Sequence, residues 1–432
     1  MIVSRAIHRA AAWRSTFSPA LSGLVLCLIL VPLPARAQPH TCGPGTVPEF
    51  GRWFSPDMDA LTSTHLTDTV EPKDPGSGIS AMRLLIEIAP GTTKEWNVVI
   101  RDSDFRGLVT MGPHDFPAGG PSSRWTGVVK TSRVILDLVA PTGSDVRVTA
   151  ADGIAYPANS TGRLFSIVNP AHPWQELYVE NGVTLPKRAG DVVGMLVGAY
   201  KTPSVRGSWC CSGVMISADV MLTNWHCGGS PDLKMKDEDY WSGQVCTNTV
   251  VDLGWAKGAP GRKYRCETVL ESNKRLDFAL LRLGNVLGPE TAAGEPNHAR
   301  MSVNRLHKGD NIFVVHHSQC MEKLVSSSCQ VQSTSFPGWL EPPAPPGSTG
   351  PDFSHNCNAE SGASGSPIFD ESGLVIGLHH VGAGAHEGTC KVSNGENKAV
   401  RITEIMHLLR ATKPALADEL GIPQEVPVDA PK

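Results

Sequence analysis

The side chains of this sequence best suited to catalysis come in the order histidine, aspartate, serine: His226, Asp277 and Ser364. His226 ends the second of two predicted strands and stands beside Cys227, an arrangement that would fix its ring as a general base requires. Asp277 opens an apolar strand, and a carboxylate that enters a core needs a hydrogen-bond donor such as an imidazole N–H. This order is one of the known orders of the Ser-His-Asp triad, so the pattern predicts nucleophilic catalysis.

Ser364 lies in a loop of small residues, 362–367, which precedes a predicted β-hairpin. Such a loop can turn backbone N–H groups into one concavity, so the N–H groups of Gly362 and Ser364 are predicted to form an oxyanion hole. Taken singly, the three segments have plainer interpretations: a structural histidine beside a disulfide, a turn-forming aspartate and a common Gly-Ser loop. Together, and in this order, they favour catalysis.

Composition limits the classes of protein to which the chain can belong. It has 432 residues, 41% of them hydrophobic and 19% charged, with 43 Gly and 34 Pro. The glycine and proline content is above average but below the disordered range, which favours a loop-rich, largely β globular protein. A net charge of −4 excludes a basic nucleic-acid binder, and 6% aromatic residues are too few for a stacking platform along single strands.

The first 37 residues are predicted to be a secretory signal peptide. Basic residues without acidic ones precede the apolar run 24–31, which is too short to span a bilayer, and residues 35–37 (ARA) provide a small-x-small cleavage site. The alternative is a retained anchor helix, although Pro32 and Pro34 end the apolar run early. Cleavage would remove four arginines and Cys27, leaving a net charge of −8 and ten cysteines, and an even number in an exported chain favours disulfides. The expected location is therefore secreted or periplasmic.

The chain after the signal peptide divides into two parts that differ in residue pattern and composition. Residues 38–186 contain short alternating apolar runs separated by turn residues, the pattern of a β-sandwich or jelly roll, and no cluster of chemical side chains. This part is predicted to be a non-catalytic β domain. Residues 187–412 hold nine of the ten remaining cysteines and many glycines, and only Ile402–Leu409 shows helical periodicity. The proline-rich stretch 341–347 is expected to be a surface loop, and residues 413–432 a loose tail.

Three motifs in the second part resemble those of the chymotrypsin-like (trypsin-fold) serine peptidases. Residues 223–227 (TNWHC) match the family's T-A-A-H-C, residues 277–280 (DFAL) match D-I-A-L, and residues 362–367 (GASGSP) match G-D-S-G-G-P. The resemblance covers about residues 190–411. It implies two packed six-stranded β-barrels with the active site between them, followed by a C-terminal helix. It also implies Ser364 as nucleophile, His226 as general acid and base, and Asp277 as the group that orients His226.

The departures from the family pattern point to a branch within it. Ala363 stands where trypsin-like zymogens have an aspartate that receives the new N-terminal amine, so that activation switch is expected to be absent. Residues 365–367 and the histidine pairs 316/317 and 379/380 are similar to those of exported bacterial lysyl and glutamyl endopeptidases. In that branch a β domain often precedes the peptidase, and residues 125–129 resemble part of it. Residues 187–188 (KR) at the junction would then be a processing site or ordinary linker.

Substrate preference is left open between two alternatives. Asn358 stands six residues before Ser364, where trypsin-type pockets have an aspartate for Arg or Lys side chains, and its amide does not support that form of basic specificity. His379 matches the position at which glutamyl endopeptidases place a histidine against an acidic P1 side chain. An acidic P1 preference is therefore expected first, and a basic P1 side chain recognised by another acidic residue is the alternative.

The cysteines and the paired histidines give further expectations. Resemblance to the family and a short loop between two strands predict a disulfide Cys211–Cys227, and the positions of Cys329 and Cys357 favour a second. The paired histidines lack a carboxylate or cysteine at ligand spacing, so neither a metal nor another cofactor is expected.

The predicted function is a secreted, monomeric serine endopeptidase that hydrolyses protein or peptide substrates through an acyl-enzyme on Ser364. No nucleic-acid partner is expected, and no membrane association after signal cleavage. The alternative from another class is an inactive trypsin-fold protein that serves as a binding module.

Overall fold

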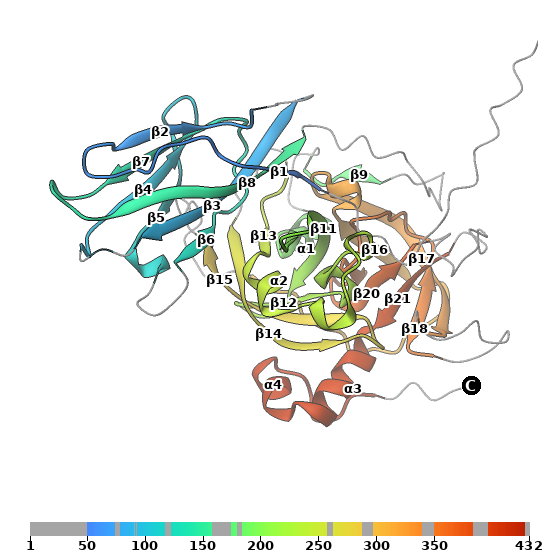
Figure 1. The fold of residues 1–432 in the computed structure, drawn as a ribbon. Coiled ribbons are helices and arrows are strands. Elements are labelled where there is room, and N and C mark those ends of the chain that lie inside the picture. The colour runs from blue at the N-terminus through green and yellow to red at the C-terminus, as the bar shows by residue number, and fades with distance from the viewer. Residues whose placement is uncertain are drawn as a thin grey trace, which may run out of the picture. The chain divides into compact units, whose positions relative to one another are not determined.

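The computed structural model describes residues 50–73, 78–89, 91, 93–116, 122–157, 174–178, 184–256, 262–286, 297–338, 350–382 and 396–427 (Figure 1). The predicted signal peptide, Cys42, Cys390 and the loop 341–347 lie outside these residues. All described residues belong to one unit of the chain, residues 41–432. None of the described helices is long and apolar enough to cross a membrane.

The N-terminal part consists of two four-stranded antiparallel sheets. The first has the order β1 (Arg52–Phe54), β8 (Arg147–Pro157), β3 (Ile79–Ala89) and β6 (Ser123–Trp125). The second has the order β2 (Thr67–Val70), β7 (Val134–Val139), β4 (Asn97–Arg101) and β5 (Gly107–Met111), after which a short 3-10 turn follows, η1 (Pro113–Asp115). Alternate residues of the strands are buried between the sheets, as in β7, where Val134, Leu136 and Leu138 face the core. The expected sandwich is confirmed.

The first half of the C-terminal part is a closed six-stranded barrel. Its order is β10 (Val193–Lys201), β11 (Arg206–Met215), β12 (Val220–Thr223), β15 (Phe278–Val286), β14 (Lys263–Asn273) and β13 (Val250–Asp252). Its connections include α1 (Leu185–Gly190) before the barrel, α2 (Gly243–Thr247) and the 3-10 turns η2 (His226–Gly228), η3 (Pro231–Leu233) and η4 (Asp237–Asp239). Residues 187 and 188, the candidate processing site, lie inside α1, so cleavage there would require that short helix to open.

The second half is another six-stranded barrel. Its order is β16 (Asn311–His316), β19 (Pro367–Asp370), β20 (Val375–Val381), β21 (Asn397–Arg401), β18 (Asp352–His355) and β17 (Leu324–Phe336). The pairing of β16 with β17 closes the ring, and β9 (Gln175–Glu176) adds to the outer edge of β17. A 3-10 turn, η5 (Ser318–Cys320), joins β16 to β17. The predicted double barrel is confirmed.

Two helices end the described chain. The predicted helix at Ile402–Leu409 is observed as α3 (Ile402–Thr412), whose apolar side is buried in the core. The tail that the sequence analysis expects to be loose instead begins with α4 (Pro414–Glu419), which starts at a proline in the first turn. The physical reason is a second set of apolar residues, since Ala417, Leu420 and Ile422 are buried against the same core.

The sandwich and the first barrel share a buried apolar cluster. Its members come from strands of the sandwich, such as Ile154 and Tyr156, and from strands of the barrel, such as Met195 and Val197. Polar contacts border the cluster, since the Trp125 Nε1–H donates to Asn248 Oδ1 (2.8 Å) and the buried Arg83 donates to the Asn248 carbonyl (2.9 Å).

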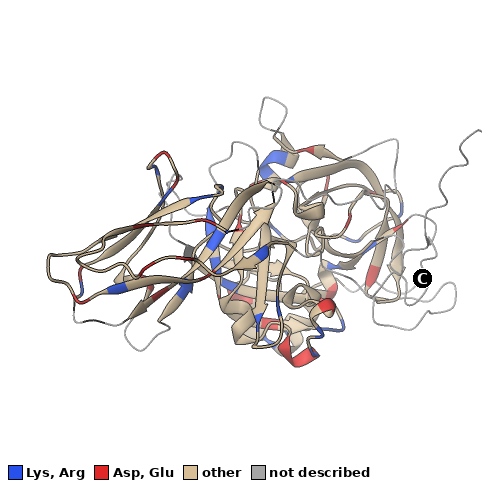
Figure 2. Cartoon of the chain, turned by 45° about the horizontal axis from the view of Figure 1, so that its top comes forward, with Lys and Arg blue, Asp and Glu red and all other residues tan. Residues whose placement is uncertain are grey.

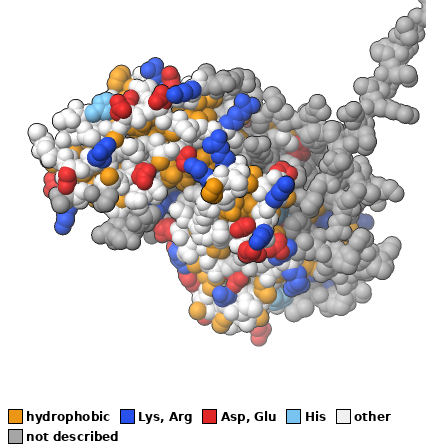
Figure 3. Space-filling model, in the orientation of Figure 1, with side chains coloured by type: hydrophobic (Ala, Val, Ile, Leu, Met, Phe, Trp, Pro, Cys, Tyr) orange, Lys and Arg blue, Asp and Glu red, His pale blue; other side chains and the backbone are white. Residues whose placement is uncertain are grey.

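Charges and apolar side chains are dispersed over the surface. Figure 2 shows basic and acidic residues interspersed along the ribbon, and Figure 3 shows apolar side chains scattered among charged ones on one face. Isolated apolar side chains of this kind are ordinary for a protein surface.

Candidate active site

His226 and Asp277 are brought together by the pairing of two strands. Strands β12 and β15 run antiparallel with Thr223 opposite Ala279, so the residue three positions after Thr223 and the residue two positions before Ala279 emerge at the same end. There His226 Nδ1 lies 2.7 Å from Asp277 Oδ2, and the His226 backbone N–H donates to Asp277 Oδ1 (2.9 Å). The Asn224 side chain donates to the Asp277 carbonyl (2.8 Å), which ties the two segments a third time.

The burial of this pair determines its charge and its tautomer. Asp277 is fully buried and His226 is 4% exposed. Burial would raise the pKa of Asp277, but the charges and hydrogen bonds of His226 and His380 outweigh it and lower that pKa, so the carboxylate is ionised. A carboxylate at Nδ1 holds the proton of the neutral imidazole on that nitrogen, which leaves the His226 Nε2 lone pair to accept a proton.

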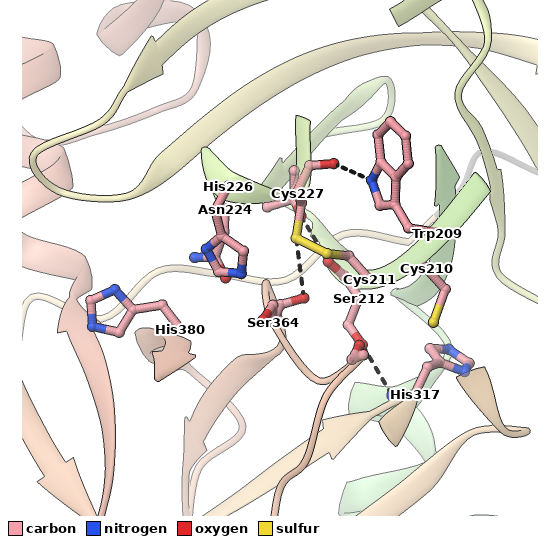
Figure 4. Close-up of a disulfide and its surroundings, with 12 residues drawn as sticks. Trp209, Cys210, Cys211, Ser212, Asn224, His226, Cys227, His317, Ser364 and His380 are labelled. Atoms are coloured by element: carbon pink, nitrogen blue, oxygen red, sulfur yellow. Dashed lines mark hydrogen bonds between the residues drawn. A yellow bond between two sulfur atoms is a disulfide. The ribbon is translucent and has the colours of Figure 1, made fainter. Parts of the chain in front are cut away.

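Ser364 reaches this pair from the second barrel. Its carbonyl accepts the Ser212 backbone N–H (2.8 Å) of β11 and lies 3.7 Å from the Sγ of Cys227, the neighbour of His226. Figure 4 shows Ser364 next to His226 on the side facing the disulfide. The loop turns sharply around Ser364, because Gly362 and Gly365 have φ values of +96° and +83° that favour glycine. Ser364 is half-buried and lies where this loop of the second barrel meets β11 of the first.

Two backbone N–H groups beside Ser364 have the property that an oxyanion hole needs. Among the described residues, the N–H groups of Gly362 and Ser364 donate to no protein acceptor, although Gly362 itself is buried. Buried backbone donors are almost always paired, so the unpaired N–H of the buried Gly362, next to that of the half-buried Ser364, points to an acceptor supplied from outside.

A neighbouring loop holds the Ser364 loop without the ion pair of trypsin-like zymogens. Ala363 is fully buried, so no charge is placed there. The Gly362 carbonyl accepts the Ser212 Oγ–H (2.9 Å), Gln319 donates from its backbone to the Ser361 carbonyl (2.6 Å), and its side chain donates to Glu360 Oε2 (2.8 Å). A disulfide, Cys210–Cys320, fastens η5 and its Gln319 to β11.

His380 is a site residue to which the sequence analysis assigned no catalytic role, since it noted the pair 379/380 only for its resemblance to bacterial endopeptidases and as an unsupported metal site. Its Nδ1 lies 3.4 Å from Asp277 Oδ2, and its Nε2 lies 3.0 Å from Asp352 Oδ2. Burial opposes a charged ring, but Asp352 and Asp277 outweigh it and raise the pKa of His380 to about 9. Strand alternation offered a signal, because adjacent residues point to opposite faces and the two histidines at 379 and 380 must have different partners.

His379 belongs to a hydrogen-bonded pair on the other face of β20. The Cys357 backbone N–H donates to His355 Nδ1 (3.3 Å), and His355 Nε2 lies 3.3 Å from His379 Nδ1. Burial and neighbouring histidines lower the pKa of both rings, that of His355 to about 3, so both are neutral at pH 7. His355 must then carry its proton on Nε2 and donate to His379, which leaves the proton of His379 on its own Nε2.

The other predicted pocket residue, Asn358, is also buried. Its backbone N–H donates to Ser326 Oγ (2.8 Å), and the preceding carbonyl, of Cys357, accepts the Asn397 side chain (2.7 Å). The sequence analysis did not identify His355, Ser326 or Asn397 as neighbours of this region.

The structure pairs all eight described cysteines. Besides the predicted Cys211–Cys227 and Cys329–Cys357, it contains two disulfides that were not predicted, Cys210–Cys320 and Cys246–Cys266. Cys211, His226 and Cys227 are close enough to be considered as metal ligands, but the two sulfurs form a disulfide and offer no thiolate.

Comparison with known proteins agrees with this geometry. Residues 211–378 match the family model of the trypsin-like peptidase domain, a range that includes His226, Asp277 and Ser364. Residues 211–378 are therefore similar to trypsin-like peptidase domains. No curated protein matches the sequence.

Among solved structures, the Rv3671c protease of M. tuberculosis is similar in its active form, with 16% identity over 56% of this chain and 89% of that chain and a TM-score of 0.36. Its inactive form matches with 16% identity over 53% of this chain and 92% of that chain and a TM-score of 0.35.

Proposed function

We propose that the protein is an exported serine endopeptidase that uses Ser364, His226 and Asp277. The observation that carries the proposal is the buried His226–Asp277 pair beside a half-buried serine flanked by two unpaired backbone donors. Each group has the role that acyl transfer requires, and the matched family is a family of peptidases.

The chemistry follows from these positions. His226 Nε2 takes the proton of the Ser364 hydroxyl while the oxygen attacks the carbonyl carbon of the scissile bond. The Gly362 and Ser364 N–H groups hold the negative oxygen that forms, and the ionised Asp277 stabilises the imidazolium. His226 then gives the proton to the leaving amine, which releases the new N-terminus and leaves an acyl-enzyme. A water molecule, deprotonated by His226, completes hydrolysis by the same steps.

Export is the second part of the proposal. Four disulfides among the described residues suit an oxidising compartment, and the N-terminal sequence has the pattern of a signal peptide. The expected location is therefore the periplasm or the medium.

The third part of the proposal is a preference for substrates with an acidic P1 side chain. The donor chain from Cys357 through His355 leaves the His379 Nε2–H to donate, and a donor suits a carboxylate better than an ammonium or guanidinium group. The carboxylates near this region are engaged, because Asp352 pairs with His380 and Glu360 accepts from Gln319. This balance favours the glutamyl-like over the lysyl-like alternative.

The test is digestion of a denatured protein mixture by the processed protein, with the cleavage sites identified by mass spectrometry. Cuts after Glu and Asp that disappear in Ser364→Ala are expected. Cuts after Lys would support the lysyl-like alternative, and cuts spread over all P1 types would remove the acidic pocket. Absence of any cut attributable to Ser364 would leave the inactive binding protein as the better reading.

A further inference from the structure

We propose that His380 is a positioning residue of the catalytic site, a cationic side chain that binds the Asp277 carboxylate together with His226. The inference rests on the proposed function, since it assigns a role within that site. The main observation is that both rings approach the same oxygen atom. Asp277 Oδ2 lies 2.7 Å from His226 Nδ1 and 3.4 Å from His380 Nδ1.

The second carboxylate gives His380 its charge. Asp352 Oδ2 lies 3.0 Å from His380 Nε2, so each ring nitrogen faces an anionic oxygen. A neutral imidazole has one proton and could donate to only one of them, whereas an imidazolium can donate to both. His380, Asp277 and Asp352 are all at most 2% exposed, so water cannot replace the missing donor.

The charge balance explains how this arrangement serves catalysis. With His380 charged, the cluster of Asp277, Asp352 and His380 carries one net negative charge when His226 is neutral. When His226 takes the serine proton, the three residues and His226 together become neutral. Without the charge on His380, two uncompensated buried carboxylates would lie beside His226 and favour its protonated form before the reaction starts. Figure 4 shows His226 between His380 and Ser364.

The other described titratable groups around His380 do not bridge Asp277 and Asp352 as its ring does. From β18 and β20 the neighbouring rings are those of His355 and His379, both neutral because their pKa values are lowered by burial. Lys398 of β21 lies near Asp352 only, and its Nζ lies 4.0 Å from the centre of the Phe336 ring. Among these described groups, His380 is the one whose two ring nitrogens face both carboxylates.

The first test is the pH dependence of kcat/KM on a substrate that the wild type cleaves. His380→Gln keeps the size of the side chain and removes its charge. The pH below which kcat/KM falls should then rise by about one unit, because the two carboxylates favour the protonated form of His226. His380→Lys restores a cation and should return the limb toward that of the wild type. An unchanged limb with only a lower plateau in His380→Gln would mean a merely structural role and overturn the proposal.

The second test does not need activity. In ¹⁵N-histidine NMR of the Ser364→Ala protein, one ring assigned through His380→Gln should be protonated on both nitrogens at pH 7.5. Asp352→Asn should lower the pH at which that ring titrates, because one of its two carboxylates is lost. A neutral His380 ring at pH 7.5 would contradict the inference whether or not the protein proves to be a peptidase.

Discussion

The two faces of β20 hold adjacent histidines in opposite electrostatic states. His379 faces the neutral ring of His355, and burial lowers its pKa, whereas His380 faces Asp277 and Asp352, and its pKa is raised to about 9. A histidine side chain thus serves as a neutral donor on one face of β20 and as a cation on the other. Residue type therefore predicts which chemistry is possible, while the partners across the sheet determine the charge state.

The largest expected effect lies on the His380 face. Asp277→Asn should lower kcat by about 10⁴-fold, because an amide no longer fixes the tautomer of His226 or stabilises its charged form. Steady-state kinetics on a cleaved peptide checks this value. Asp219→Asn, at the far end of the β12–β15 pair where Asp219 meets Arg282, is a matched control that should change kcat less than twofold. A small loss of kcat in Asp277→Asn would show that catalysis does not depend on this carboxylate.

The next effect lies on the His379 face. His379→Val removes the donor but suits a strand, so kcat/KM for substrates with Glu at P1 should fall about 10- to 100-fold. Substrates with an apolar P1 residue should change less than threefold, because the opposite face of β20 is untouched. Equal losses for all P1 residues would show that the variant damages the catalytic groups and that the two faces are not independent.

The smallest effect, about tenfold in the unfolding equilibrium for each pH unit, concerns stability in acid. His316 is fully buried, and burial lowers its pKa to about 3, below the 6.5 of an exposed imidazole. Between pH 6.5 and 3 the unfolded chain binds a proton at this residue and the folded chain does not, so stability falls as pH falls. The free energy of unfolding should lose about 1.4 kcal/mol per pH unit through this residue alone.

The variant that removes this titration is His316→Asn, whose side-chain oxygen can replace the Nδ1 that accepts from the Ser318 backbone N–H. Denaturant unfolding at pH 6, 5 and 4 should show a shallower dependence on pH in the variant, whatever its stability at pH 7. An identical slope would contradict a neutral buried histidine. His380→Gln should not flatten this acidic slope, because a ring with a raised pKa keeps its proton below pH 6.5 in both states.

Much of the fold could be predicted from the sequence because its signals are local. Apolar alternation indicated the sandwich, and the segments that contain His226, Asp277 and Ser364 each carry a short motif at the end of a strand or in a turn. The helix α3 has its own periodicity. The buried end of α4 was missed because its apolar residues are few and follow Pro414, so the surrounding prolines and charges dominated the interpretation.

The missed parts of the site depend on distant partners. His380 pairs with Asp277, a residue of the other barrel, and with Asp352, a residue of a strand that is not its neighbour in the sheet. The disulfide Cys210–Cys320 spans 110 residues, and nothing in the spacing of cysteines selects that pair from the alternatives. Such contacts are set by the closure of the barrels, which a motif does not encode.

The nucleophile is tested most directly by a fluorophosphonate probe whose adduct is located by mass spectrometry. The processed wild type should carry one adduct on Ser364, and Ser364→Ala should carry none. Ser366→Ala is the matched control, since Ser366 lies in the same loop but is fully buried, and it should still be labelled. An adduct on another serine, or labelling of the wild type no greater than that of Ser364→Ala, would show that Ser364 is not the nucleophile.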